Sequence, residues 1–426
     1  MKTLTVEHIT RIEGHLNFTV IVDKEANVKA RAEALEGVRL LERLLIGKSY
    51  REVPDIVSRM CGVCQAIHRI TSIQALEDAF GITLPEELEK LRKIIAIGGH
   101  LQSHVLHLFI FVLPDFTGHK NILGMLPKHG ELISRAFRLK KLANDITEAI
   151  GGRAIHPITP VVGGFSKIPS RRTLEIALDK AREFRKIAEE VIPVVLSLEM
   201  PDFKRKTHYV SLYNGKEFPL LRGSVKISQG NIFKPSEYED YIEYITEEYS
   251  TARHYVLKKE RLEYMVGALS RININYDFLT DTAKSMAKTY GLKYPAYSPF
   301  ENNKAQALEI IHFAEEVVDL IEDLLHRPAK TEKVEFSVKE GEGVSVTEAP
   351  RGLLIHHYKV NEQGRIEKAN IITPTAQNYK NIEADLVAYT TKLLLSNVEN
   401  IEFELKKLVR AYDPCISCSA RFFKEH

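Results

Sequence analysis

The sequence predicts an α+β chain of 426 residues that is mainly α-helical and carries small β-sheets. Three observations favour this class. Apolar residues recur at helical spacing over long stretches, short β-branched runs lie beside turn signals near both ends, and a hydrophobic fraction of 44% suffices for a substantial core. Because the chain shows no internal repeat, low-complexity tract or linker, we expect a single domain spanning residues 1–426.

The first part of the chain predicts a small antiparallel sheet. Alternation and β-branched residues mark 4–9, 16–22 and 28–34 as strands, and the polar run 23–27 is typical of a turn. Residues 11–15 would form the first connection.

Helical spacing follows this sheet. Pro54 stands where a second helix can begin, and that helix would carry Cys61 and Cys64 near its middle or kink at Gly62. A longer helix is predicted over 85–113, where a proline next stops the pattern.

The remainder combines amphipathic helices with short strands. Residues 171–199 place apolar side chains on one face and charges on the other, which predicts a helix, and 201–235 shows short β-like runs that we interpret as a surface insertion. We also expect a helix over 305–325, strands at 344–347, 353–360 and 365–372, and a final helix at about 381–409.

Charge and hydropathy exclude several classes of function. The 59 Lys and Arg nearly balance the 57 Asp and Glu, so no net field favours nucleic acid or an anionic membrane. The start of the chain lacks the apolar run of a signal peptide, and the most apolar stretch, 105–113, is too short to span a membrane. We therefore expect a cytoplasmic protein without a membrane span.

All four cysteines stand in two C-x-x-C pairs, one at Cys61 and Cys64 and the other at Cys415 and Cys418. Two such pairs supply the four sulfurs that soft metals favour, and 350 residues lie between the pairs, so the fold must bring the two ends of the chain together. Two disulfides are disfavoured in a cytoplasmic chain. From the residues alone, a zinc ion and an iron-sulfur cluster both stay open as occupants, with Gly62 allowing close backbone approach.

Four short motifs, two of which contain the cysteine pairs, are distributed along the whole chain. They are Arg-Ile-Glu-Gly-His at 11–15, Arg-Met-Cys-Gly-Val-Cys at 59–64, Glu-Ala-Pro-Arg-Gly at 348–352 and Asp-Pro-Cys-Ile-Ser-Cys at 413–418. With these motifs the chain resembles the large subunit of [NiFe] hydrogenases, in particular the alpha subunit of cytoplasmic archaeal sulfhydrogenases. The resemblance implies a large-subunit fold with a central helix bundle and small peripheral sheets.

The resemblance also implies the occupants of the cysteine site. Cys61 and Cys415 match the two terminal thiolates of nickel, whereas Cys64 and Cys418 match the two thiolates that bridge nickel and iron. The iron would carry carbon monoxide and cyanide ligands. Two shared sulfurs keep the second metal close to the first.

Proton handling is the remaining task in the implied reaction, the reversible heterolytic cleavage of dihydrogen into a hydride and a proton. Cys415 is the candidate base and Glu13 the residue that relays the proton onward. Arg351 matches an arginine poised over the two metals, and Asp115 and Asp413 match acids that orient it.

One further histidine and one further metal complete the expected site. His68 would hydrogen-bond near a bridging sulfur. Glu42, the backbone carbonyl of Ile371 and Arg421 match the ligands of a magnesium or second iron site in the family. Many relatives have histidine at the position of Arg421, and an arginine side chain cannot ligate, so this third site departs from the family pattern.

The resemblance implies partners as well. Residues 422–426 match an extension that a maturation endopeptidase removes. Because the chain has no further cysteine for an electron relay and no dinucleotide motif, we expect a small iron-sulfur subunit, together with further subunits that carry iron-sulfur clusters, FAD and NAD(P), forming a heterotetramer.

Three other functions remain as alternatives. An F420-linked or ferredoxin-linked hydrogenase would differ only in its partner chains. A non-catalytic subunit of a quinone reductase is disfavoured because such subunits lack the four thiolates, and a structural zinc or iron-sulfur protein would be separated by metal analysis.

Overall fold

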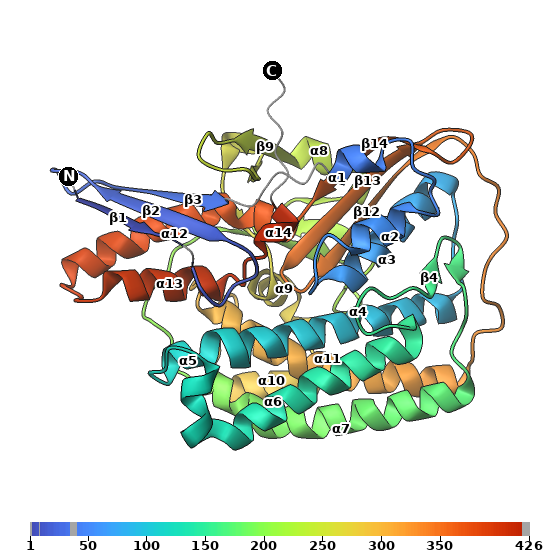
Figure 1. The fold of residues 1–426 in the computed structure, drawn as a ribbon, viewed down its shortest axis with the longest axis horizontal. Coiled ribbons are helices and arrows are strands. Elements are labelled where there is room, and N and C mark those ends of the chain that lie inside the picture. Colours follow the sequence, from blue (N-terminus) through green and yellow to red (C-terminus); the bar gives the residue numbers. More distant parts are fainter. Residues whose placement is uncertain (1, 8, 35–40, 420–426) are drawn as a thin grey trace.

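The computed structural model describes residues 2–7, 9–34 and 41–419. Four long helices pack side by side as a bundle along one side of the molecule, which is the lower half of the view in Figure 1. They are α4 (Glu86–Leu106), α6 (Ile122–Gly151), α7 (Arg171–Leu196) and α11 (Glu301–His326). This bundle confirms the mainly helical class, and α7 confirms the helix predicted over 171–199.

The sequence explains how α7 begins and packs. The Ser170 side chain accepts a hydrogen bond from the backbone N–H of Thr173, which satisfies one of the free donors at the helix start. Leu174, Ala177 and Ala181 recur at helical spacing and are buried against the bundle.

Helix α4 continues without interruption through a π-helical segment (His107–Val112) into α5 (Leu113–Phe116). Among the described residues this run, Glu86–Phe116, is the one helix long and apolar enough to cross a membrane, and 83% of its apolar window is buried inside the protein. Its composition is accounted for by its place in the core of the bundle.

Two three-stranded antiparallel sheets lie at opposite ends of the chain. The first has the order β1 (Lys2–Val6), β2 (Leu16–Val22), β3 (Val28–Ala34). The predicted first strand, 4–9, is therefore displaced toward the amino terminus. The second sheet has the order β12 (Gly341–Ala349), β13 (Gly352–Val360), β14 (Ile366–Ile372), as the sequence predicts.

The second sheet packs on helix α3 (Gln65–Phe80), which starts beside the first cysteine pair (Figure 1). Glycine is required at this contact. A Cβ atom on Gly341 would lie 2.2 Å from the carbonyl oxygen of Ala79, and one on Gly343 would lie 2.2 Å from that of Ala75. The strand and the helix can approach this closely only because neither glycine has a side chain.

Residues 201–300 form a second group of short elements. A four-stranded sheet has the order β11 (Tyr264–Met265), β6 (His208–Tyr213), β7 (Ser224–Ile227), β8 (Ile232–Phe233), and β9 (Ile242–Thr246) pairs with β10 (Arg253–Leu257). Helices α8 (Tyr238–Tyr241), α9 (Ala268–Asn275) and α10 (Asp281–Thr289) complete it.

The stretch 201–235 is not confined to the surface. Val210 and Leu212 on β6 are fully buried and share an apolar core with Leu353 and Ile355 of β13. The interpretation of these strands as a surface insertion therefore fails for β6, because alternation alone does not show that both faces of a strand are covered.

Two predicted helices have different boundaries. The helix starting near Pro54 ends early, as α2 (Val53–Ser58), after α1 (Leu41–Leu45). The predicted final helix is two helices, α12 (Pro374–Leu395) and α13 (Ile401–Ala411), because Asn397 adopts a left-handed conformation with φ of 50° between them. A short helix, α14 (Ile416–Ser419), follows.

Candidate metal centre

The four cysteine sulfurs lie within 4.8 Å of one another in the interior of the protein. The Sγ atoms of Cys61 and Cys415 are 3.4 Å apart, those of Cys64 and Cys418 are 3.3 Å apart, and those of Cys415 and Cys418 are 3.0 Å apart. All four side chains are buried. The convergence of the two ends of the chain, which the spacing of the cysteines required, is thus present.

The first cysteine pair sits in the connection between α2 and α3, not within a helix as predicted. The Sγ atom of Cys61 accepts hydrogen bonds from the backbone N–H groups of Val63 and Cys64, at 3.3 and 3.2 Å. Cys64 is the residue that precedes the first turn of α3. By accepting these hydrogen bonds, the sulfur stabilises the break between the two helices. The spacing of apolar residues does not predict such a break.

Backbone contacts fix the second pair beside the amino-terminal segment. Glu13 and Cys415 form an isolated parallel β-bridge, and the Ile416 N–H donates to the Glu13 carbonyl at 2.9 Å. The Cys415 N–H donates to the Thr375 hydroxyl at 2.9 Å. These contacts hold the loop at 11–15, the start of α12 and residues 415–416 together.

The donor set fits soft metal cations. The sulfur separations of 3.0 Å or more exceed the bond length of a disulfide, about 2.05 Å, so the thiols are free. Burial raises the pKa of Cys64, whereas hydrogen bonds from the Cys415, Cys418 and Cys64 thiols lower the pKa of Cys61. Four buried thiols can ionise together only if positive charge enters among them, and metal ions supply that charge.

Arg351 adds a fixed positive charge beside the sulfurs. Its Nε donates to the Asp413 carbonyl at 2.6 Å and its Nη2 donates to Asp413 Oδ1 at 2.9 Å. Despite burial, which lowers it, the pKa of Arg351 is held well above the usual value by Asp413 and, after it, by the Cys415, Cys61 and Cys64 sulfurs. Its Nη1 is buried without a hydrogen-bond partner among the described residues, which leaves one donor free for a group bound at the sulfurs.

Glu13 contacts both the cluster and the loop that carries it. Its Oε2 accepts a hydrogen bond from the Cys415 thiol at 3.1 Å and from the Ser417 N–H at 3.1 Å. Its Oε1 accepts from the Ser417 hydroxyl. The carboxylate is therefore held within proton-transfer distance of one sulfur.

Asp115 differs from the sequence-based expectation. Its carboxylate accepts two hydrogen bonds from Arg410, at 2.6 and 3.0 Å, and pairs with Arg11. Arg351 is not among its partners in the described part of the chain. Asp413 alone of the two acids orients Arg351, while Asp115 joins α5, α13 and the loop at 11–15.

His68 lies on α3 beside the second pair. Its Nε2 is 3.9 Å from the Cys418 Sγ, and its Nδ1 is 3.2 Å from Nε2 of His356 on β13. The ring thus stands next to the Cys418 sulfur.

The expected third metal site is described only in part. Glu42 Oε1 accepts a hydrogen bond from the Ile371 N–H at 2.9 Å, so these two residues are brought together. Arg421 and the extension 422–426 lie outside the described residues.

Sequence reasoning missed several residues around the cluster. Ser417 and Thr375 hold Glu13 and the Cys415 backbone, and Gln306 on α11 donates to Asp413 at 3.2 Å. Ser417 could have been found from its place between the last two cysteines. Gln306 carried no signal, because its contact joins residues 107 positions apart.

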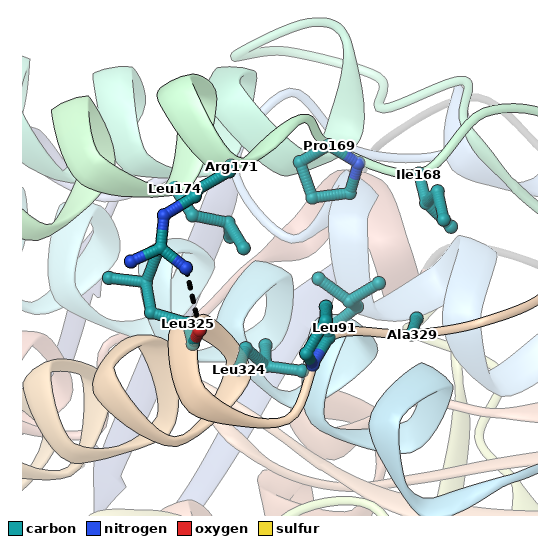
Figure 2. Close-up of a pocket in the computed structure, with 9 residues that line it drawn as sticks. Leu91, Ile168, Pro169, Arg171, Leu174, Leu324, Leu325 and Ala329 are labelled. Atoms are coloured by element: carbon teal, nitrogen blue, oxygen red, sulfur yellow. Dashed lines mark hydrogen bonds between the residues drawn. The ribbon is translucent and has the colours of Figure 1, made fainter.

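An apolar pocket elsewhere contributes nothing to this centre. Figure 2 shows that it lies between the start of α7 and the end of α11, with Arg171 donating to the Leu325 carbonyl at 3.0 Å. Its lining is mainly leucine, isoleucine and proline, with no metal-ligating side chain.

Two sequence profiles match the chain. The profile of the nickel-dependent hydrogenases matches residues 39–136 and 224–421, and a profile described as HoxL-like matches residues 3–32. The first covers more than half of the chain and includes both cysteine pairs.

Individual relatives match over nearly the full length. The chain is 36% identical to the alpha chain of sulfhydrogenase 1 of Pyrococcus furiosus over 98% of this chain and 97% of the relative. It is 34% identical to the alpha chain of sulfhydrogenase 2 of the same organism, with 99% of each chain covered. A chain of the F420-non-reducing hydrogenase vhu of Methanocaldococcus jannaschii is 32% identical, covering 90% of this chain and 97% of the relative.

Solved structures share the fold. A structure of an NAD+-reducing [NiFe]-hydrogenase in the H2-reduced state superposes with a TM-score of 0.89 and 28% identity, covering 99% of this chain and 100% of that one. A [NiFeSe] hydrogenase of Desulfovibrio vulgaris Hildenborough superposes with a TM-score of 0.78 at 24% identity, covering 99% of this chain and 100% of that one, and supports the fold alone.

The buried four-cysteine cage on a large helical fold defines a metal-binding protein, and the profile and the relatives make it an oxidoreductase. The matches also identify the family: the chain belongs to the nickel-dependent hydrogenases. It is the catalytic large subunit of a [NiFe] hydrogenase.

Proposed function

We propose that Cys61, Cys64, Cys415 and Cys418 hold one nickel and one iron ion, with Cys61 and Cys415 as the terminal ligands of nickel and the other two as bridges. The arrangement of the four sulfurs in a buried cage no wider than 4.8 Å carries this proposal. When bound, such a centre supplies the reversible heterolytic cleavage of dihydrogen. We infer carbon monoxide and cyanide on the iron from the family resemblance.

Cys415 and Glu13 handle the proton in this proposal. The Cys415 thiolate accepts the proton at Sγ, and Glu13 Oε2, 3.1 Å away, receives it. Ser417 holds the carboxylate from both its N–H and its hydroxyl, so that Glu13 stays in line with the sulfur. Positioning of this kind removes the need to reorganise the relay during the reaction.

Arg351 and His68 shape the space around the sulfurs. Asp413 holds the guanidinium through two hydrogen bonds and leaves Nη1 free, so a donor of fixed orientation faces a small diatomic molecule. His68 places an imidazole nitrogen beside Cys418 and tunes the charge on that sulfur.

The electrons leave through partner subunits. Relatives named as alpha chains of sulfhydrogenases support an assembly of several chains, and the superposed NAD+-reducing hydrogenase supports NAD(P) as the acceptor. We propose a small iron-sulfur subunit plus flavin and iron-sulfur subunits in the cytoplasm, with sulfur or polysulfide reduction as a second activity. We also propose a magnesium or iron ion held by Glu42, the backbone carbonyl of Ile371 and Arg421, and removal of 422–426 by a maturation endopeptidase.

The acceptor has one alternative that the relatives raise. Relatives named F420-non-reducing hydrogenases are also about a third identical to this chain, so a ferredoxin-linked or another acceptor stands beside NAD(P). Identification of the chains that co-purify distinguishes these acceptors.

Metal analysis and hydrogen-dependent dye reduction test the proposed centre. The purified complex should contain one nickel ion per copy of this chain and show infrared bands of iron-bound diatomic ligands. Cys418→Ser should abolish hydrogen uptake and lower the nickel content. Active, pure protein without nickel would overturn the proposal.

A further inference from the structure

His68 belongs to a row of three buried polar side chains that starts at the metal centre. His68 lies on α3, and His356 and Tyr358 lie on β13, where a spacing of two residues places both on the same face of the strand. His68 is 1% exposed, and the other two are fully buried. The reaction described above uses His68 alone, so it gives no role to His356 and Tyr358.

Polar atoms are in contact along the whole row. The Nε2 atom of His68 is 3.9 Å from the Cys418 sulfur, which is a direct contact because sulfur is larger than oxygen. The Nδ1 atom of His68 is 3.2 Å from Nε2 of His356, and Nδ1 of His356 is 2.6 Å from the Tyr358 hydroxyl oxygen. The row therefore joins a sulfur of the second cysteine pair to a tyrosine of the neighbouring sheet without a gap.

The Cys418 sulfur decides which atoms in the row donate hydrogen bonds. A cysteine that ligates a metal is a thiolate, which can only accept, so the N–H of His68 stands on Nε2. A neutral imidazole carries one N–H, so Nδ1 of His68 accepts from Nε2 of His356. Nδ1 of His356 then accepts from the Tyr358 hydroxyl. With both rings neutral, each contact in the row joins one donor to one acceptor.

All three donors point toward the sulfur in this arrangement. Hydrogen bonds in such a chain polarise one another, so the Tyr358 hydroxyl strengthens the bond that reaches Cys418. The hydroxyl also favours one tautomer of His356. Without it, Nδ1 of His356 loses the donor from which it accepts, and the tautomer with the proton on Nδ1 becomes accessible. In that tautomer Nε2 cannot donate to His68.

The fold holds the row in place. Tyr358 pairs in register with Gly343 of β12, and a Cβ atom on Gly343 would lie 2.2 Å from the Ala75 carbonyl oxygen of α3. Helix α3 therefore lies close against the sheet beside Tyr358. His357, the next residue on β13, faces the other side of the sheet, so the alternation of the strand directs His356 and Tyr358 toward α3.

We propose that His356 and Tyr358 are positioning residues, which fix His68 as a hydrogen-bond donor to Cys418 and lower the electron density that this sulfur gives to the iron. The inference rests on the proposed nickel-iron centre and deepens it. Hydrogen bonds to the sulfur ligands of a metal centre are among the features that set its reduction potential. Tyr358 thereby influences the centre although two side chains stand between it and the sulfur.

Tyr358→Phe in the complete nickel-loaded complex tests the row. Phenylalanine keeps the ring and its packing but removes the hydroxyl. Tyr264→Phe is the matched control: Tyr264 is also fully buried, and its hydroxyl donates to Gln377 at 3.1 Å, outside the row. His356→Leu is a second variant, because it removes the donor to His68 directly.

The infrared bands of the diatomic ligands on iron report the electron density at the centre. A sulfur with a weaker hydrogen bond makes the iron richer in electrons, and this lowers the stretching frequencies of bound carbon monoxide and cyanide. We expect the bands of Tyr358→Phe and His356→Leu to shift to lower frequency at native nickel content, and those of Tyr264→Phe to match the native complex. A redox titration should show a more negative midpoint potential in the same two variants.

His68→Ala shows whether Tyr358 acts through the row. Because that variant breaks the row next to the sulfur, adding Tyr358→Phe to it should cause no further band shift. If His68→Ala loads no nickel, His356→Leu takes its place as the background, since it breaks the row one step further out. A full further shift would show that Tyr358 acts by another route and would overturn the proposal.

Other outcomes also decide against the proposal. Unchanged or raised frequencies in Tyr358→Phe would show that the hydroxyl does not strengthen the bond to the sulfur. If Tyr358→Phe loads no nickel, His356→Leu decides by the same criteria, and if neither loads nickel while Tyr264→Phe does, the two residues are structural and the proposal fails. A native complex without bands of diatomic ligands would instead refute the proposed nickel-iron centre.

Discussion

Glu13 and Cys415 lie 402 positions apart in the chain and are in direct contact, with the Cys415 thiol donating to the Glu13 carboxylate at 3.1 Å. The same two residues also form a β-bridge, so they are in contact through both backbone and side-chain atoms. The amino-terminal loop thereby delivers a proton acceptor to a sulfur near the other end of the chain.

Glu13→Gln tests this contact. Glutamine has nearly the same shape and still bonds to Ser417, but it cannot take a proton. Hydrogen-dependent dye reduction should fall about 100-fold or more, in the range that general acid–base catalysis contributes, at unchanged nickel content. Glu13→Asp, which keeps the acid on a shorter stem, should retain more activity than Glu13→Gln; equal losses in both would argue against a proton role.

Ser417→Ala tests how Glu13 is held. The variant removes the hydroxyl that donates to Glu13 Oε1 but keeps the backbone N–H bond at 3.1 Å. Loss of one hydrogen bond to a charged group should destabilise the loop by about 1.5–3 kcal/mol. Activity should fall less than in Glu13→Gln, and Ser417→Thr should restore it, which steady-state assays on the three variants can compare.

Arg351→Lys tests the guanidinium. Lysine keeps the positive charge but cannot hold the Asp413 carbonyl and carboxylate at once while leaving a third donor free. We expect a loss of about 100–1,000-fold in hydrogen uptake, as for removal of an oriented donor, with the thermal unfolding midpoint little changed. Native activity in the lysine variant would show that charge alone suffices.

Glu348→Gln tests a buried ion cluster behind the centre. Glu348 Oε2 pairs with Arg271 at 3.0 Å, and burial raises the Glu348 pKa from its usual 4.5 to about 7. Its contribution to stability is fully present below pH 4.5 and is lost as the pH rises through 7. This rise corresponds to about 3 kcal/mol. The free energy of urea unfolding of the native chain should therefore decrease between about pH 4.5 and 7 relative to that of Glu348→Gln. Parallel curves would contradict this assignment.

The sequence predicted the parts of the site whose residue types are rare. Only four cysteines exist, so their convergence followed from chemistry once metal binding was assumed, and the structure brings them within 4.8 Å. The amphipathic stretch 171–199 also predicted α7, because apolar residues at helical spacing form one continuous face only in a helix.

Local features with no periodic signature could not be predicted. The break at Asn397 between α12 and α13 follows from one left-handed residue, and the loop around Cys61 follows from a sulfur that accepts two N–H groups. Asp115 bonds to Arg410, 295 positions away. Nothing near either residue in the sequence indicates that pairing.

Two metals inside the cysteine cage are the basis of the proposed reaction, and anomalous diffraction from crystals of the purified complex tests their presence most directly. Data collected at the nickel and the iron absorption edges should give two separate peaks, nickel beside Cys61 and Cys415 and iron beside Cys64 and Cys418. A single zinc peak, or nickel bound at any other place on the chain, would contradict it.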